Sequence, residues 1–260
     1  MTLLRLRHGR VQYADGHEAL RDADIAISAG QFTVLLGSSG AGKSTLLRAL
    51  NGIVPLTEGG LEAQGIGRID SAAKLRVLRR RTGMVFQQHQ LMGRLSALAN
   101  VLVGRLGYHA SLRAFLPLPR EDKRIALLAL ERVGLLEHAL RRADQLSGGQ
   151  QQRVGIARAL AQQPRLVLAD EPVASLDQVT AVRVLSLLHR ICKADGIAAV
   201  VSLHQVELAR HFADRVVGIA AGRTVFDGPP TALTPAALAH IYGSAAPAGE
   251  ALLEPAALAA

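Results

Sequence analysis

The chain has 260 residues, of which 49% are hydrophobic and 20% charged, and this balance excludes a disordered or collagen-like protein. Its one cysteine, Cys192, excludes an intramolecular disulfide framework and a cysteine-based zinc site. No apolar run approaches the roughly 18 residues of a membrane-spanning helix. The net charge of +9 is compatible with phosphorylated ligands, anionic membranes or nucleic acid. Because aromatic residues make up only 3%, we expect no nucleic-acid partner.

Alternating apolar and polar residues near the N-terminus predict two half-buried strands. Leu4 and Leu6 alternate with arginines in the first, and Ile25 and Ile27 mark the buried side of the second. The continuous apolar run 31–36 predicts a central parallel strand that is buried on both faces. We therefore expect a sheet-rich N-terminal region that leads into a central strand.

The rest of the chain alternates between helical and strand patterns. It is expected to be mostly helical between about residues 88 and 163. Four residues of a helix predicted over 121–133 share its buried face: Ile125, Leu128, Ala129 and Arg132. The other predicted elements are a helix over 150–162, a strand over 166–168, a helix over 179–194, a strand over 197–203 and a hairpin over 216–226 that turns at Ala221 and Gly222. Strands that alternate with helices favour an α/β fold with a parallel sheet.

Residues 37–45 carry the pattern GxxxxGK[ST] between the predicted central strand and a helix predicted over 44–50. Glycines in such a loop allow successive backbone N–H groups to face a phosphate, and the helix N-terminus adds partial positive charge. Lys43 would contact the β- and γ-phosphates, and Ser44 would bind Mg²⁺. We expect a nucleotide-binding loop made of Gly37, Ser38, Ser39, Gly40, Ala41, Gly42, Lys43, Ser44 and Thr45.

Two adjacent acids, Asp170 and Glu171, follow the strand predicted at 166–168. Burying two carboxylates side by side is costly unless a partner compensates them, and Mg²⁺ with a water would do so. Asp170 is interpreted as the acid that serves Mg²⁺, and Glu171 as the general base that polarises the attacking water. No pair among the 9 histidines has convincing metal-ligand spacing, so a metal is expected only with the nucleotide.

The run Leu146-Ser-Gly-Gly-Gln150 resembles the signature motif of ABC-type ATPases. The other motifs of that family are present in order, and the resemblance covers roughly residues 1–243. Gln87 resembles the glutamine of the Q-loop, Asp177 ends a segment similar to the D-loop, and His204 looks like the switch histidine. These ordered motifs identify the chain as a member of the ABC ATPase superfamily.

The resemblance implies a fold and a set of site residues. The implied α/β fold is a P-loop NTPase core, a mixed or parallel sheet with flanking helices, that carries an N-terminal antiparallel β subdomain and an α-helical subdomain inserted at about 88–163. Residues 1–243 would form one ATPase domain, and 244–260 an Ala/Pro-rich tail. Catalysis is then assigned to Glu171, His204 and Gln87, magnesium binding to Ser44, Gln87 and Asp170, and ATP binding to residues 37–45 and to Tyr13, which lies where the family stacks an aromatic ring on adenine.

The signature provides a second anion site in the same chain. Ser147 and two glycines precede the helix that is predicted from near Gln150, and a hydroxyl beside free backbone N–H groups can bind a phosphate. The family uses its two sites in a head-to-tail homodimer, where the signature of one subunit closes over ATP held by the other. The residues implied to act in trans are Ser147, Gly148, Gly149, Gln150 and Asp177.

Residues 95–107 and the insert at 108–118 are similar to the corresponding regions of phosphonate-importer ATPases. This resemblance implies the ATP-hydrolysing subunit of a bacterial phosphonate importer on the cytoplasmic face of the inner membrane. Its partners would be membrane permease subunits and a periplasmic or other extracytoplasmic substrate-binding protein. Gln178, which replaces a proline, and the stretch 71–78 depart from the pattern.

Phosphonate, phosphite and phosphate-ester importers would share every motif described above, so the transported substrate stays open. Two further alternatives also stay open. The first is the ATPase of another ABC transporter, for amino acids, another oxyanion or lipoprotein release. The second is a soluble ABC ATPase that acts on ribosomes or DNA. The densest basic cluster is interpreted as a solvated helix face and consists of Arg76, Arg79, Arg80 and Arg81.

Overall fold

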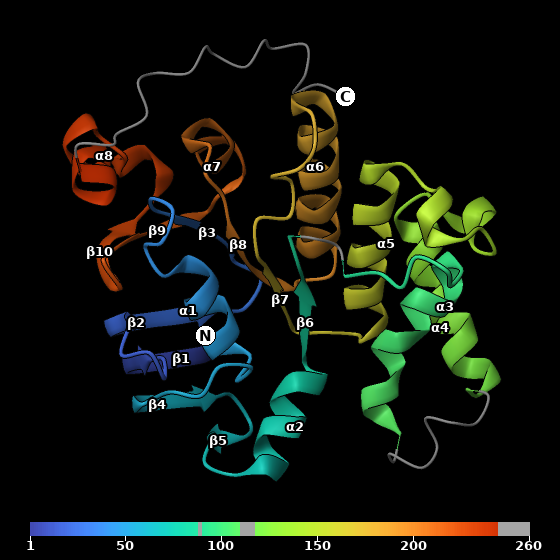
Figure 1. Cartoon of the computed structure of the whole chain (residues 1–260), viewed down its shortest axis with the longest axis horizontal. Helices are drawn as coiled ribbons and strands as arrows, with labels where there is room; N and C mark the ends of the chain where they lie inside the picture. The colour runs from blue at the N-terminus through green and yellow to red at the C-terminus, as the bar shows by residue number, and fades with distance from the viewer. Residues whose placement is uncertain (88–89, 110–117, 244–260) are drawn as a thin grey trace.

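The computed structural model describes residues 1–87, 90–109 and 118–243. Within them a mixed β-sheet carries helices on both faces, and a separate group of helices packs beside one end of the sheet (Figure 1). The tail at 244–260 and most of the insert at 108–118, both singled out in the sequence, lie outside the described residues.

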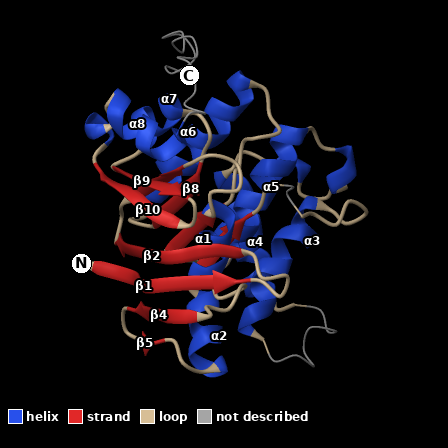
Figure 2. Cartoon of the chain, turned by 60° about the vertical axis from the view of Figure 1, so that its left-hand side comes forward, coloured by secondary structure: helices blue, strands red, loops and turns tan. Residues whose placement is uncertain are grey.

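One 10-stranded sheet runs through the molecule in the order β5-β4-β1-β2-β10-β9-β3-β8-β7-β6. Strands β9, β3, β8, β7 and β6 are parallel to one another, whereas β5, β4, β1 and β2 pair antiparallel at the other end (Figure 2). The strands are β1 (Thr2–Gln12), β2 (Glu18–Ser28), β3 (Phe32–Leu36), β4 (Glu58–Ala63), β5 (Gly67–Arg68), β6 (Thr82–Val85), β7 (Leu166–Ala169), β8 (Ala198–Ser202), β9 (Arg215–Ala220) and β10 (Arg223–Gly228). The predicted α/β class, with an antiparallel N-terminal part, is confirmed.

We define the helical lobe as α3, α4 and α5, of which α5 also packs against the sheet, and the other helices cover the sheet. The helices are α1 (Lys43–Leu50), α2 (Ala72–Arg80), α3 (Ala97–Leu102), α4 (Arg120–Arg132), α5 (Gly148–Ala161), α6 (Gln178–Ala194), α7 (Val206–Phe212) and α8 (Pro235–Tyr242), with short 3₁₀ turns η1 (Val103–Tyr108), η3 (Leu136–His138), η4 (Ala143–Gln145) and η5 (Pro230–Ala232). The helical lobe lies within the segment, at about 88–163, that the sequence predicted to be mostly helical.

The two faces of the central strands pack against different helices. Val34 and Val201 lie in a core shared with α5, α6 and α7, whereas their strand neighbours Leu35 and Val200 lie in a second core with α1 and the N-terminal strands. Successive strand residues point to opposite faces, so α1 and α5 lie on opposite sides of the sheet. This separation keeps the phosphate loop, which leads into α1, away from the signature motif, which begins α5.

The hairpin predicted near the C-terminus is confirmed. Strands β9 and β10 pair antiparallel and are joined by Ala221 and Gly222, whose φ angles of 47° and 76° are both positive. Two positive φ values give the turn that matches the right-handed twist of a hairpin. The sequence analysis did not predict β4, β5 or β6, because those segments are short and interrupted by glycine or arginine, whereas the helix face expected at the arginine cluster falls on α2.

The predicted buried face of α4 is partly wrong. Leu128 is 43% exposed, and the buried residues of the helix include Asp122, Ala126 and Leu130. The observed buried face of α4 is rotated from the predicted one because it includes an acidic residue. A prediction based on the spacing of hydrophobic residues cannot identify a buried acid. Asp122 is 4% exposed and pairs with buried Arg105, whose Nε donates to Oδ1 at 2.8 Å.

This buried ion pair ties the segments of the helical lobe together. His109 Nε2 lies 2.5 Å from the other Asp122 oxygen, and Arg105 also donates to the Ala161 carbonyl at the end of α5 at 2.9 Å. Burial by itself would raise the pKa of Asp122, but hydrogen bonds from Arg105 and His109 hold that pKa below its ordinary value. The pair thereby anchors η1 to α4 and to α5.

We expect Asp122→Asn to lower the free energy of unfolding by about 3 kcal/mol at pH 7, because it leaves the Arg105 charge buried and uncompensated. The contribution of a carboxylate with a lowered pKa is present above its unfolded pKa and is lost as the pH falls through the folded value. Urea titrations at pH 7 and at several values below about pH 4 would measure both effects. Asp144→Asn is the matched control, since Asp144 pairs with Arg142 at the surface. Equal effects from the two variants would contradict this account.

Candidate active site

The predicted phosphate loop joins β3 to α1. Gly37 and Gly42 are its tightest points, because a Cβ at either would lie 2.3 Å from the Ile219 carbonyl oxygen or 2.6 Å from the Ala19 carbonyl oxygen, respectively. Lys43 is 4% exposed, and its Nζ donates to the carbonyls of Gly37 at 2.7 Å and Ser38 at 3.1 Å. The loop therefore wraps around a buried ammonium group. Burial lowers the pKa of Lys43, and the charges of the nearby carboxylates oppose this shift.

Asp170 lies at the carboxyl end of β7 and is 3% exposed. Its Oδ1 accepts hydrogen bonds from the hydroxyls of Ser44 at 2.7 Å and Ser202 at 3.2 Å. Its Oδ2 lies 3.7 Å from the Arg48 guanidinium. Thus Ser44 and Asp170, which are 126 residues apart, meet as the sequence predicted, and an arginine balances the buried charge.

Glu171 differs from Asp170 in both backbone and exposure. Its φ of 46° is in the left-handed region, which is unfavourable for a residue with a Cβ. Its N–H donates to Ser202 Oγ at 2.8 Å, so one serine anchors both acids. The carboxylate Oε1 lies 2.5 Å from His204 Nε2. The predicted base and the predicted switch histidine are therefore in direct contact.

Gln87 is exposed and follows β6, the strand beside β7. Val85 of β6 pairs with Ala169 of β7, and the Asp170 N–H donates to the Val85 carbonyl at 2.9 Å. Gln87 and Asp170 therefore leave neighbouring parallel strands at the same edge of the sheet. A hydroxyl, a carboxylate and an amide oxygen form a donor set of the kind that Mg²⁺ prefers, so the residues present fit that ion.

The signature motif begins α5. Ser147 caps the helix, and Gln150 completes the capping box: the Gln150 N–H donates to Ser147 Oγ at 3.3 Å, and the Ser147 N–H donates back to Gln150 Oε1 at 2.9 Å. Asp177 caps α6 in the same way by accepting from the Thr180 N–H at 2.9 Å. A Cβ at Gly149 would lie 2.6 Å from the Thr180 methyl group, so the two helix starts are close together. The residues expected to act in trans hence form one surface, on the face of the sheet opposite α1.

Tyr13 follows β1 beside the phosphate loop. Its hydroxyl lies 3.2 Å from Thr45 Oγ1, and its ring is parallel to that of His17 with a centroid separation of 6.4 Å. The tyrosine is 38% exposed, which leaves part of the ring open to solvent. The structure thus places Tyr13 next to the loop that is expected to bind phosphates.

Sequence reasoning missed three residues of this site. Ser202 could have been noticed as a hydroxyl inside an apolar strand just before His204, and Arg48 as a basic residue one turn after Ser44. Tyr242 carries no sequence signal: its hydroxyl reaches the His204 carbonyl from α8 at 3.4 Å.

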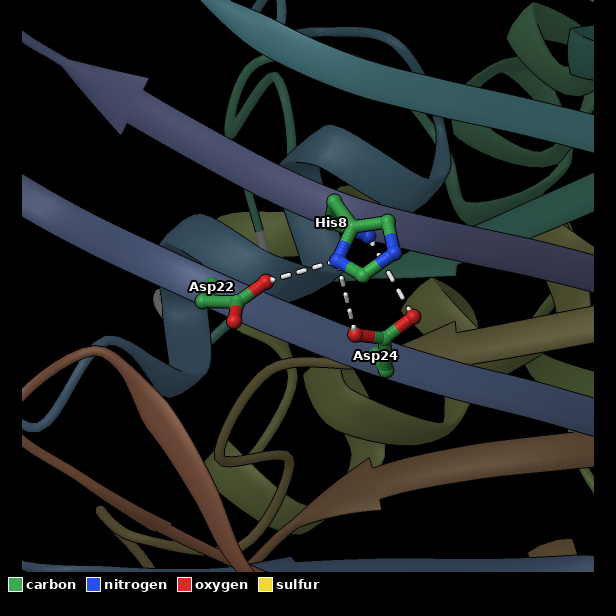
Figure 3. A group of neighbouring side chains, drawn as sticks. All are labelled: His8, Asp22 and Asp24. Atoms are coloured by element: carbon green, nitrogen blue, oxygen red, sulfur yellow. Dashed lines mark hydrogen bonds and ion pairs between the residues drawn. The ribbon is translucent and has the colours of Figure 1, made fainter.

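A second cluster of polar side chains lies on the N-terminal strands (Figure 3). Its residues are too far apart in the sequence for their spacing to predict that they meet. His8 of β1, with φ 48°, lies between Asp22 and Asp24 of β2, and its Nδ1 is 3.0 Å and 3.7 Å from their oxygens. All three side chains are exposed. A hydrogen bond to Asp22 and the charge of Asp24 raise the pKa of His8. This cross-strand pair is therefore strongest at acidic pH and weakens as the pH rises through the histidine pKa.

Comparisons with known proteins agree with this geometry. Residues 20–174 match the family model described as ABC transporter. The chain is 61% identical over 241 residues to the phosphite import ATP-binding protein PxtA of Stutzerimonas stutzeri, which covers 93% of this chain and 87% of that protein. It is 56% identical over 243 residues to the phosphonates import ATP-binding protein PhnC 3 of Nostoc sp., which covers 94% and 93%.

Solved structures show the same fold. CbiO1 from Clostridium perfringens, part of the ABC transporter complex cbiONQ, superposes with a TM-score of 0.77 at 30% identity and covers 88% of this chain and 89% of its own. The dimeric cassette MJ0796, bound to ADP and phosphate, gives 0.76 at 33% identity, with coverages of 88% and 99%. No helix of the described part of the chain is long and apolar enough to cross a membrane. The predicted superfamily and P-loop fold are confirmed: the chain belongs to the ABC transporter family, as an ATP-binding and ATP-hydrolysing subunit.

Proposed function

We propose that this chain hydrolyses ATP to power the import of phosphonates or phosphite. The observation that carries the proposal is its identity of 56–61%, over more than nine-tenths of its length, to proteins named for phosphonate and phosphite import. These relatives do not favour an amino-acid or lipoprotein transporter or a soluble ATPase. Phosphonate and phosphite are both tetrahedral phosphorus oxyanions, and the substrate class is proposed at that level.

ATP is proposed to bind with its phosphates in the loop 37–45 and its adenine near Tyr13. The buried ammonium of Lys43 would exchange the carbonyls of Gly37 and Ser38 for phosphate oxygens. Mg²⁺ is proposed to be held by Ser44, Asp170 and Gln87, and when bound it supplies positive charge beside the phosphates. The contact between Ser44 and Asp170 supports this assignment.

Hydrolysis requires a base that takes a proton from the attacking water, and Glu171 is proposed for this role. Asp170 is poorly suited because both of its oxygens already face hydroxyl or guanidinium groups. The Glu171 carboxylate is 15% exposed, and His204 is its hydrogen-bond partner among the described side chains. His204 would orient that carboxylate and reach the γ-phosphate. Ser202 would hold the Glu171 backbone in its left-handed conformation.

We propose that two copies assemble head to tail, as the resemblance implied. The phosphate loop and the signature motif lie on opposite faces of the sheet, so one chain cannot place both against a single nucleotide. Ser147, Gly148, Gly149, Gln150 and Asp177 of one copy would therefore complete the site of the other. ATP would bridge the two copies, and its hydrolysis would let them separate.

A membrane permease is the partner that an import ATPase must move, and we propose that it docks in a groove of about 1110 Å³ between α2 and the helical lobe. Phe86 lines this groove and directly precedes Gln87 in the chain. A permease segment bound in the groove would therefore contact the residue next to Gln87, which is proposed to help hold Mg²⁺. Asn51 also lines it, is 7% exposed, and its Oδ1 has no hydrogen-bond partner among the described residues. A permease segment with an acidic group and an N–H or O–H donor fits these features.

The arginines of α2 give the groove its positive charge. They are exposed, as predicted, but they also make contacts that the prediction of a solvated helix face missed. Arg79 donates to the Gly52 carbonyl at 2.6 Å, and Arg80 donates to the Gly107 carbonyl at 2.6 Å. The two bonds fix the guanidinium groups at the groove, where they would attract an acidic segment. Through the permease, the chain would lie at the cytoplasmic face of the inner membrane, and a periplasmic or other extracytoplasmic protein would supply the substrate.

The test is ATP hydrolysis by the complex assembled from this chain and the permease and substrate-binding protein encoded by neighbouring genes, in proteoliposomes. We expect binding protein loaded with methylphosphonate or phosphite to stimulate hydrolysis, and expect no stimulation from binding protein loaded with amino acids. Stimulation by an amino acid alone would overturn the proposed substrate class. Loss of stimulation on replacing Arg79 and Arg80 with Glu, with ATP binding retained, would support the groove as the permease site.

A further inference from the structure

Helix α8 brings the last described residues of the chain to the sheet. The helix begins after Thr234, whose Oγ1 accepts from the Ala237 N–H at 3.2 Å, and it packs beside β9 and β10 (Figure 1). Ile241 is 1% exposed and lies against Gly218 of β9, where a Cβ would come within 2.5 Å of its side chain. The close approach of helix and strand fixes the position of the next residue, Tyr242.

The hydroxyl of Tyr242 lies between two loops of the active site. It donates to the His204 carbonyl at 3.4 Å, and the Gly37 backbone also hydrogen-bonds to it. Burial raises the pKa of Tyr242 to about 12, and the hydrogen bond from Gly37 opposes this rise. The phenol therefore stays protonated near neutral pH and remains a hydrogen-bond donor.

Each of these two backbone partners leads directly to a group that the hydrolysis reaction needs. The Gly37 carbonyl accepts from Lys43 Nζ at 2.7 Å, and His204 Nε2 lies 2.5 Å from Glu171. One hydroxyl thus connects the loop that leads to the phosphate-binding lysine with the loop that holds His204, the contact of the base.

We propose that Tyr242 is a positioning residue, which holds the His204 loop at a fixed distance from the phosphate loop so that His204 meets the γ-phosphate while contacting Glu171. This inference rests on the role proposed above for His204. The Tyr242 hydroxyl bonds to backbone groups, and its proposed role needs no contact with ATP. Its loss is expected to slow hydrolysis and to leave ATP binding nearly unchanged.

The test is steady-state ATP hydrolysis by the complex assembled with its permease, for Tyr242→Phe, His204→Ala and the double variant. Phenylalanine keeps the packing of the ring and removes only the hydroxyl. We expect kcat to fall about five- to tenfold, the size expected for one neutral hydrogen bond, and KM for ATP to change less than twofold. Because Tyr242 acts through His204, adding Tyr242→Phe to His204→Ala is expected to cause no further loss.

Ile241→Val is the matched structural control, since it weakens the packing of the same helix on Gly218 without touching either loop. It is expected to lower the melting temperature and to leave kcat unchanged. Wild-type kcat in Tyr242→Phe, or a loss that adds fully to that of His204→Ala, would overturn the role of Tyr242. If His204→Ala itself retained wild-type kcat, the role of His204 would fail separately, and the two outcomes are distinguishable.

Discussion

Glu171→Gln is expected to bind ATP with wild-type affinity and to lose hydrolysis by a factor on the order of 10² to 10⁴. Glutamine keeps the size of the side chain and can still contact His204, but its amide cannot accept a proton from water. The measurement is ATP turnover by the complex assembled with its permease, together with nucleotide affinity by calorimetry. Dimers held together by ATP are expected to accumulate in this variant, because the step that separates them is blocked.

Glu121→Gln is the control for this experiment. Glu121 is an exposed acid of α4 that pairs with Arg124 on its own helix, far from β7 in the sequence and in the fold. Its replacement should leave turnover unchanged. Near wild-type hydrolysis by Glu171→Gln would show that Glu171 is not the general base and that another group accepts the proton.

Lys43→Met is expected to weaken ATP binding by a factor on the order of 10² to 10³. Methionine retains a buried stem of similar length but removes the ammonium group. The lost charge-assisted hydrogen bonds to phosphate are each worth about 1.5–3 kcal/mol. Calorimetric titration with ATP in the presence of Mg²⁺ would measure the change.

Lys74→Met is the matched variant for Lys43→Met. Lys74 is a surface residue of α2, and its ammonium pairs with Asp70 at 2.9 Å, outside the phosphate loop. Its loss should leave ATP affinity within experimental error. If Lys43→Met bound ATP as tightly as Lys74→Met, the loop would hold its nucleotide without this charge, and the site would have to be assigned again.

Sequence could predict two kinds of site residue. Some lie in one contiguous segment, and others follow strands of the same parallel sheet and therefore meet at one edge of it. The loop at 37–45 is contiguous, and Asp170 ends a strand of the same parallel sheet, so its meeting with Ser44 follows from the rule that strand ends gather at one edge. Glu171 and His204 follow adjacent strands β7 and β8 and meet for the same reason.

What sequence could not predict depends on contacts made across the fold. Tyr242 reaches His204 only because α8 turns back over β9, and His8 meets Asp22 only through the register of β1 on β2. The face of α4 was misjudged because buried Asp122 is compensated by Arg105 from another segment. In each case the contacting residue is distant in the chain, and the local pattern of hydrophobic residues does not indicate where it lies in the fold.

The central claim is that the phosphate loop of one copy works with the signature motif of another, and cysteine crosslinking tests it most directly. Ser39 and Ser147 are both exposed, and the native Cys192 is buried with a thiol pKa raised to about 12, so it does not react. The double variant Ser39→Cys and Ser147→Cys would be oxidised with and without ATP in the Glu171→Gln background. We predict crosslinked dimers that need ATP and both new cysteines. Failure to form any dimer in the presence of ATP, or equal crosslinking without nucleotide, would contradict the composite site.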